Sequence, residues 1–188
     1  SVSAFLLNRS SDLSLDAGVI LLGNISVENM NEFESMFGEL PVLFQESALV
    51  DRIHGFIKGW DIPKMNDNLK VSGWGLNSEY FCSIMHLLRD DASYRAIVDN
   101  AVVYSSNAYV RHVEAVKRIA TAYLKLLFPH VRKPSDIDPK EFIRYCLRPA
   151  SNMRKNIWRQ LSILDIEYKN EDKEMPTFKL KEGLTHEP

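Results

Sequence analysis

Three polar side chains, Asn24, Arg52 and Arg111, occupy positions from which they could act on a phosphate group. Arg52 directly follows Asp51 at the end of a short amphipathic segment, LFQESALVDR. An arginine at a helix end can present its planar guanidinium to a neighbouring subunit and spread positive charge over transferring phosphoryl oxygens, the arginine-finger role. The alternative is structural, with Arg52 pairing with Asp51 or capping helix carbonyls, and spacing alone favours it.

Asn24 ends the apolar run AGVILLGN, residues 17–24. An apolar run bounded by glycines predicts a strand buried on both faces, as in a parallel sheet beneath helices. Ligands bind beyond the carboxyl ends of such strands, so Asn24 could orient a water or contact a phosphate. It could equally cap the turn that follows.

Arg111 lies in the first turn of the most periodic segment of the chain, residues 108–128. Apolar residues recur there at intervals of four and three, which predicts one amphipathic helix ended by Pro129. A cation in the first turn opposes the helix dipole, a small local cost that a phosphate-binding site accepts. Exposed arginines are nevertheless common at this position. The stripe comprises Tyr109, Val113, Val116, Ala120, Tyr123 and Leu127.

Other segments are predicted to form helices or strands, but their residues have no clear chemical role. Residues 78–89 are predicted to be helical, and residues 94–104 fit a helix or a strand. Cys82 and His86 have the i,i+4 spacing of metal ligands, but no further ligands recur nearby, so we interpret them as packing residues and predict no metal site.

Residues 139–166 predict two helices broken at Pro149. The second carries Arg154, Lys155 and Arg159. This basic face could contact nucleic acid or a neighbouring subunit, although such faces are usually just solvated.

Composition narrows the class of protein. The chain has 188 residues, enough for one large domain or two small ones, and a net charge of −2 that gives no argument for nucleic acid or an anionic membrane as partner. No apolar run is long enough to span a membrane. Cys82 and Cys146 lie far apart, which favours a reduced, cytoplasmic setting.

Complete catalytic motifs are missing from the sequence. It contains no GxxxxGK[ST] phosphate loop, no GxSxG, no HExxH and no pair of residues that suggests a peptidase dyad. Taken by itself, the chain therefore shows no complete catalytic constellation.

Three segments together resemble the Lon-like AAA+ ATPases of bacterial phage-exclusion (BREX) systems, which are often described as ATP-dependent Lon proteases. They are AGVILLGNI, ALVDRIHGFIKGWDIPKM and YVRHVEAVKRIATAYLKLLFPH, and the resemblance extends over residues 4–165. The string DRIHGFIKGWDIPK is its most specific part. More distantly, LVDRIHGFI and RHVEAVKRIA are similar to the arginine-finger and sensor-2 segments of replicative helicase AAA+ modules.

The resemblance implies roles for the three polar residues. Asn24 would be sensor 1, Arg52 the finger acting on a neighbouring subunit, and Arg111 sensor 2 on a helical lid. The parent protein would bind ATP and Mg between the subunits of a ring that acts on DNA or a protein substrate. Its Walker A and Walker B motifs would precede Ser1, and a Lon-type protease-like domain would follow Pro188. The chain would then be an internal fragment that is not active alone and binds no cofactor alone.

The expected fold is α/β turning to mostly α. Residues 1–64 would be the C-terminal part of an AAA+ core, 65–133 the helical lid, 134–168 a helical connector and 169–188 a weakly ordered tail. The alternative is a non-enzymatic helical adaptor or DNA-binding module, based on the basic face at 154–159.

Overall fold

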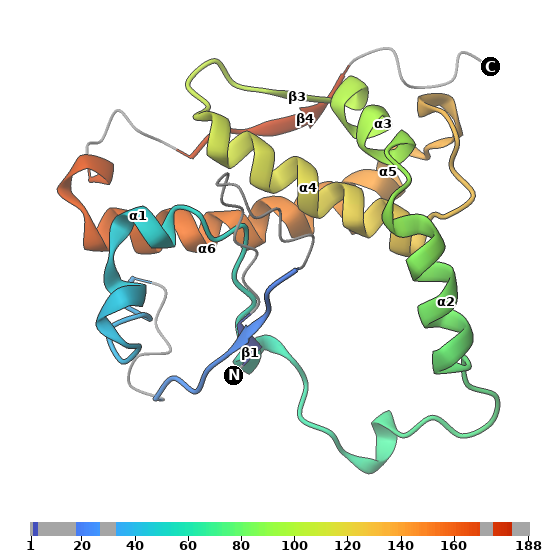
Figure 1. Ribbon diagram of the computed structural model, residues 1–188, viewed down its shortest axis with the longest axis horizontal. Helices are drawn as coiled ribbons and strands as arrows, with labels where there is room; N and C mark the ends of the chain where they lie inside the picture. Colours follow the sequence, from blue (N-terminus) through green and yellow to red (C-terminus); the bar gives the residue numbers. More distant parts are fainter. Residues whose placement is uncertain (1, 4–17, 27–32, 170–174, 182–188) are drawn as a thin grey trace.

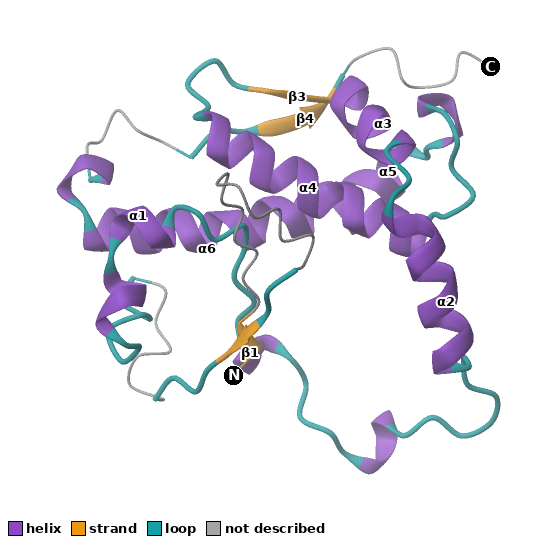
Figure 2. Cartoon of the chain, in the orientation of Figure 1, coloured by secondary structure: helices purple, strands orange, loops and turns teal. Residues whose placement is uncertain are grey.

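The computed structural model of the protein describes residues 2–3, 18–26, 33–169 and 175–181, and helices dominate these residues (Figures 1 and 2). The strands are β1 (Val2–Ser3), β2 (Leu21–Leu22), β3 (Val102–Tyr104) and β4 (Phe178–Leu180). The α-helices are α1 (Ser47–Val50), α2 (Ser78–Arg89), α3 (Ser93–Ala101), α4 (Val110–Leu127), α5 (Pro139–Phe142) and α6 (Arg148–Leu164). Short 3-10 turns are η2 (Val42–Gln45), η3 (Gly59–Asp61), η4 (Asp67–Leu69), η5 (Pro134–Asp136) and η7 (Ile166–Tyr168), and η6 (Ile143–Leu147) is a π-helix.

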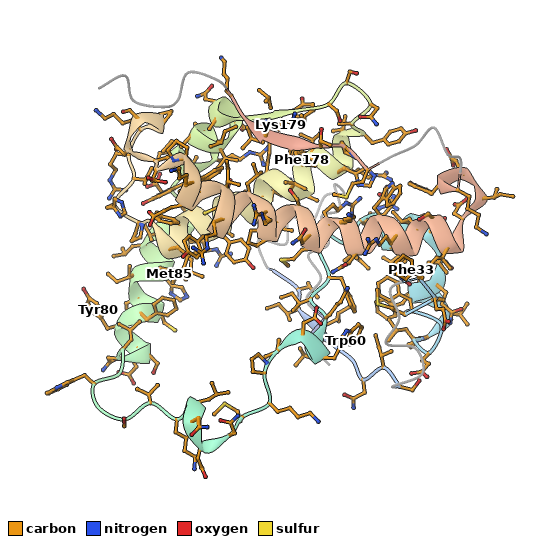
Figure 3. The ribbon with its side chains drawn as sticks, turned by 180° about the vertical axis from the view of Figure 1, so that it is seen from behind. Phe33, Trp60, Tyr80, Met85, Phe178 and Lys179 are labelled. Carbon is orange, nitrogen blue, oxygen red and sulfur yellow. The ribbon has the colours of Figure 1, made fainter. Side chains whose placement is uncertain are left out.

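Helices α4 and α6 lie against each other at the centre of the molecule (Figure 1). The stripe predicted for α4 is buried in its middle, whereas its ends, Tyr109 and Leu127, are about half exposed. The buried face is wider than the stripe because α3 and α6 both pack on this helix, which also buries Ala115, Ile119 and Leu124. The first hydrophobic cluster forms here, with Phe178 of β4 packed against it (Figure 3).

A second hydrophobic cluster joins the N-terminal part of the chain to α6. Ile157 and Leu161 of α6 pack there with Val50, Ile53 and Phe56, and Trp60 lies at its edge (Figure 3). Helix α6 thus contributes to both clusters, since its Ala150 belongs to the first. The segment expected to be a connector is therefore the helix on which both parts of the core pack.

Pro149 does not break this helix, contrary to the prediction. α5, η6 and α6 follow one another without interruption, and the residues flanking each junction keep right-handed helical dihedrals. A proline ring clashes with the carbonyl one turn earlier in a regular α-helix. The wider π-turn just before Pro149 relieves that clash, which sequence periodicity cannot reveal.

The apolar run ending at Asn24 is not the doubly buried parallel strand that was predicted. β2 pairs antiparallel with β1, and Ile20 and Leu22 are 66% and 68% exposed. Burial on both faces requires packed layers on both sides of a sheet, and the described residues supply no such layers here. Ala17, the first residue of that run, lies outside the described residues.

The C-terminal segment also departs from the prediction. Phe178–Leu180 form β4, which pairs antiparallel with β3 through Val102↔Leu180 and Tyr104↔Phe178. The ambiguous segment 94–104 resolves into both alternatives, because α3 ends at Ala101 and β3 follows directly. Partners distant in sequence decide both outcomes, as is usual for short strands.

The predicted helix at 78–89 is confirmed as α2, with side chains of Cys82 and His86 exposed rather than packed. Within the described part of the chain, no group of His, Cys, Asp and Glu side chains is placed to hold a metal ion. No helix among the same residues has the length and apolar character needed to cross a membrane. Residues 65–75 form a loop, which contains η4 and extends away from the body (Figure 1).

Gly55 allows the segment after Arg52 to lie close to both central helices. A Cβ on Gly55 would stand 2.9 Å from Met153 Cβ on α6 and 3.0 Å from Ile119 Cδ1 on α4. Replacing it by alanine would overpack a site with little room to relax. We therefore expect Gly55→Ala to destabilise the protein by about 1–3 kcal/mol in urea unfolding.

Gly75→Ala is the matched control, because a Cβ there meets nothing within 4 Å. The free energy of unfolding of Gly75→Ala should equal that of the unchanged protein or be slightly higher. Equal urea midpoints for the two variants would show that the close approach at Gly55 does not constrain the fold.

Candidate functional site

A buried ion pair lies where the end of α1 meets α6. Arg154 of α6 is fully buried, and its Nη2 donates to Asp51 Oδ1 at 2.7 Å. Its Nη1 donates to the backbone carbonyls of Asp51 and Ile53. One guanidinium thus fixes both the carboxylate and the backbone on either side of Arg52. Burial lowers the pKa of Arg154, and the Asp51 carboxylate acts in the opposite direction.

His112 of α4 completes the hydrogen bonding of Arg154. Arg154 Nε donates to His112 Nδ1 at 2.9 Å, so Nδ1 carries no proton and the imidazole is neutral. Burial, followed by the charge of Arg154, lowers the pKa of His112 to about 4. Through Arg154, His112 therefore links α4 to α6 and to the end of α1.

Arg111, one residue earlier on α4, reaches the same carboxylate from the solvent side. Its Nη1 donates to Asp51 Oδ2, and this hydrogen bond raises the pKa of Arg111. The side chain is 56% exposed, whereas that of Asp51 is 6% exposed. Asp51 therefore holds a buried cation on one oxygen and a half-exposed cation on the other.

Arg52 is exposed at the end of α1, and its Nη1 donates to the Ala48 carbonyl. This is the helix-capping contact that the sequence left open, and Asp51 pairs with Arg111 and Arg154 instead. The capping contact fixes where the guanidinium lies in this chain. The finger role, which concerns a neighbouring subunit, stays a prediction.

Arg52 and Arg111 line one hollow of about 120 Å³. We call it the arginine hollow, since four arginines, Arg52, Arg111, Arg118 and Arg154, line it together with Asp51 and Glu114. The hollow is smaller than the ~300 Å³ at which small-molecule pockets begin. Its size and positive charge suit a single anionic group rather than a whole nucleotide.

Asn24 lies elsewhere. It is exposed, just after β2, and is not among the residues that line the arginine hollow. The structure thus brings two of the three predicted site residues together and leaves the third apart.

Sequence reasoning missed the buried cluster of Asp51, His112 and Arg154, although a signal existed. Arg154 falls in the helical stripe of Ala150, Ile157 and Leu161, all of which are buried. Arg154 is therefore a core residue and is not part of an exposed basic face at 154–159. Of the other two, Lys155 is exposed, and Arg159 is half-buried with its guanidinium carbon 5.5 Å from the Phe33 ring centroid.

Removing the buried guanidinium should destabilise the fold strongly. Arg154→Met leaves carbonyl and carboxylate oxygens in the core without their donor, so we expect a loss of about 3 kcal/mol or more in urea unfolding. Lys155→Met, at the exposed neighbouring position, should change stability by about 0.5 kcal/mol or less. Similar losses in both variants would contradict the structural role of Arg154.

The neutral His112 predicts a pH dependence of stability. Between pH 6.5 and about 4 the unfolded chain takes up a proton at this imidazole that the folded chain does not. Stability is therefore fully present above pH 6.5 and should fall by ~3 kcal/mol as the pH drops to 4. His112→Gln keeps an acceptor for Arg154 but cannot titrate, so its unfolding free energy should fall less over this range. An unchanged slope would show that His112 is not responsible.

Comparison with known proteins shows the family to which the chain is similar. The model of the family described as "Lon-like protease BrxL-like, ATPase domain" matches residues 5–174. The Lon-like protease BrxL of Escherichia coli O9:H4 (strain HS) is 31% identical over 150 residues, which cover 79% of this chain and 21% of that protein. The Lon-like protease BrxL of Bacillus cereus (strain H3081.97) is 28% identical over 134 residues, which cover 70% and 20%.

The chain spans about a fifth of the length of these curated relatives. The family match includes the DRIHGFIKGWDIPK segment, the most specific part of the resemblance drawn from the sequence. That resemblance is confirmed, and the chain belongs to the family of Lon-like protease BrxL-like ATPase domains.

Proposed function

We propose that this chain is part of a longer AAA+ ring ATPase and presents Arg52 and Arg111 to the phosphates of a nucleotide bound by an adjoining subunit. The observation that carries the proposal is the arginine hollow, which gathers two arginines from distant parts of the sequence. The match to an ATPase-domain family supports a nucleotide phosphate as the anion.

The donor set of the hollow fits phosphate oxygens. Guanidiniums bind them through paired N–H donors, and Arg111 is half exposed while Asp51 holds it in place. The same donors do not fit the magnesium ion that accompanies ATP, because a cationic lining repels a cation. We therefore assign only phosphate contacts to this surface.

The small volume of the hollow also supports the proposal that Arg52 and Arg111 contact a nucleotide bound by an adjoining subunit. That volume leaves room for a phosphate group but not for a base and ribose, so the rest of the nucleotide would lie on the partner. Because Arg52 and Arg111 line one hollow, both would face the same nucleotide. Asn24, outside the hollow, would align the attacking water at the nucleotide of its own subunit, the sensor-1 role.

Within this proposal, residues 1–64 correspond to the C-terminal part of an AAA+ core, and residues 65–133 correspond to its helical lid. ATP supplies the phosphoryl group that is transferred to water. Arg52 would stabilise the charge that develops on that group, and Arg111 would couple the nucleotide to movement of the lid. The ring would work in the cytoplasm in phage defence, on DNA or a protein substrate.

The test is ATP turnover by the purified intact protein. Arg52→Ala should lower kcat by about 10³-fold, as fingers do elsewhere, and Arg111→Ala should lower kcat/KM, with assembly preserved in both. Arg144→Ala is the control, because Arg144 is exposed on η6 and does not line the hollow. Turnover by Arg52→Ala at the control rate would rule out the finger assignment.

A further inference from the structure

A third exposed arginine lines the arginine hollow. Arg118 lies seven residues after Arg111 on α4, two turns along the helix and on the same face. Its side chain is 42% exposed, and the residue lines the hollow with Arg52 and Arg111. The fold thus directs three solvent-accessible guanidiniums to one small space.

Arg118 lies beside Glu114 and His54 at the hollow. Its Nε lies 3.7 Å from Glu114 Oε2, beyond hydrogen-bond distance, and its Nη1 lies 3.5 Å from His54 Nε2. Glu114 is bound more firmly on its other side, because Arg95 Nη2 of α3 donates to Glu114 Oε1 at 2.8 Å. Arg95 in turn pairs with Asp99 at 2.9 Å. Arg95 of α3 therefore fixes the Glu114 carboxylate, beside which the Arg118 guanidinium lies.

The charge of the hollow is a further reason to expect a bound anion. The lining residues include four arginines and two acidic residues, so positive charge is in excess. An ordinary i,i+4 pair such as Glu114 and Arg118 stabilises a helix by only a few tenths of a kcal/mol, so helix stability alone gives little reason for a cation at this position. A bound anion would balance the excess.

We propose that Arg118 is a third ligand of the phosphate that Arg52 and Arg111 contact, and that Glu114, anchored by Arg95, is its positioning residue. The inference rests on the proposed function, since it adds a residue to the same site. Three guanidiniums around one group would match the several oxygens that a terminal phosphate presents.

The experiment compares Arg118→Ala, Arg118→Lys and Glu114→Gln with Arg52→Ala and Arg144→Ala in the intact protein. Steady-state kcat and KM for ATP are measured, together with the Kd of a fluorescent ATP analogue and of its ADP counterpart. Arg118→Ala should lower kcat/KM by about tenfold to hundredfold and weaken the ATP analogue more than the ADP analogue. Arg118→Lys should recover part of the loss by keeping the charge, and Glu114→Gln should lose less than Arg118→Ala.

The melting temperature separates this role from a structural one. Because Arg118 is partly exposed, Arg118→Ala should melt close to the control. Control-level kinetics and nucleotide affinity in Arg118→Ala, with Arg52→Ala inactive, would overturn this inference and leave the proposed function standing. Turnover at the control rate in both Arg118→Ala and Arg52→Ala would overturn this inference and the proposed function together. An equal loss for the ATP and ADP analogues would also count against Arg118 as a ligand of the terminal phosphate.

Discussion

The buried pair of Asp51 and Arg154 is the interaction on which the rest of this structure depends. It joins the end of α1 to α6, and through His112 and Arg111 it joins both to α4. Taking two charges out of water costs several kcal/mol per ion, so such a pair is poor evidence for stability as such. Its effect here is positional, because it sets where Arg52 and Arg111 stand relative to each other.

Two features of the backbone allow that pair to form. Gly55 lets the segment after Arg52 approach α4 and α6 closely, and the π-turn at Ile143–Leu147 carries one helix past Pro149. With that helix uninterrupted, Ile157 and Leu161 reach the second cluster while Ala150 serves the first. The hollow is thus shaped by backbone packing as well as by its charged side chains.

The arrangement also explains how a site can be cationic without losing order. Arg154 is buried and paired with Asp51, whereas Arg52, Arg111 and Arg118 are exposed or half exposed around it. A buried ion pair beneath exposed cations would suit the anion site proposed above. Membership in an ATPase-domain family is consistent with that use.

The sequence by itself determined the amphipathic helices near residues 78–89 and 108–128, and it singled out Arg52 and Arg111, which line one hollow. Helical periodicity is a local property, so α2 and most of α4 could be predicted from spacing, and Arg52 and Arg111 could be singled out from their places at helix ends. Tertiary structure alone decided that β2 is exposed, that Phe178–Leu180 pair with β3, and that Arg154 pairs with Asp51. Burial and strand pairing depend on partners far away in the chain, and a local pattern cannot name them.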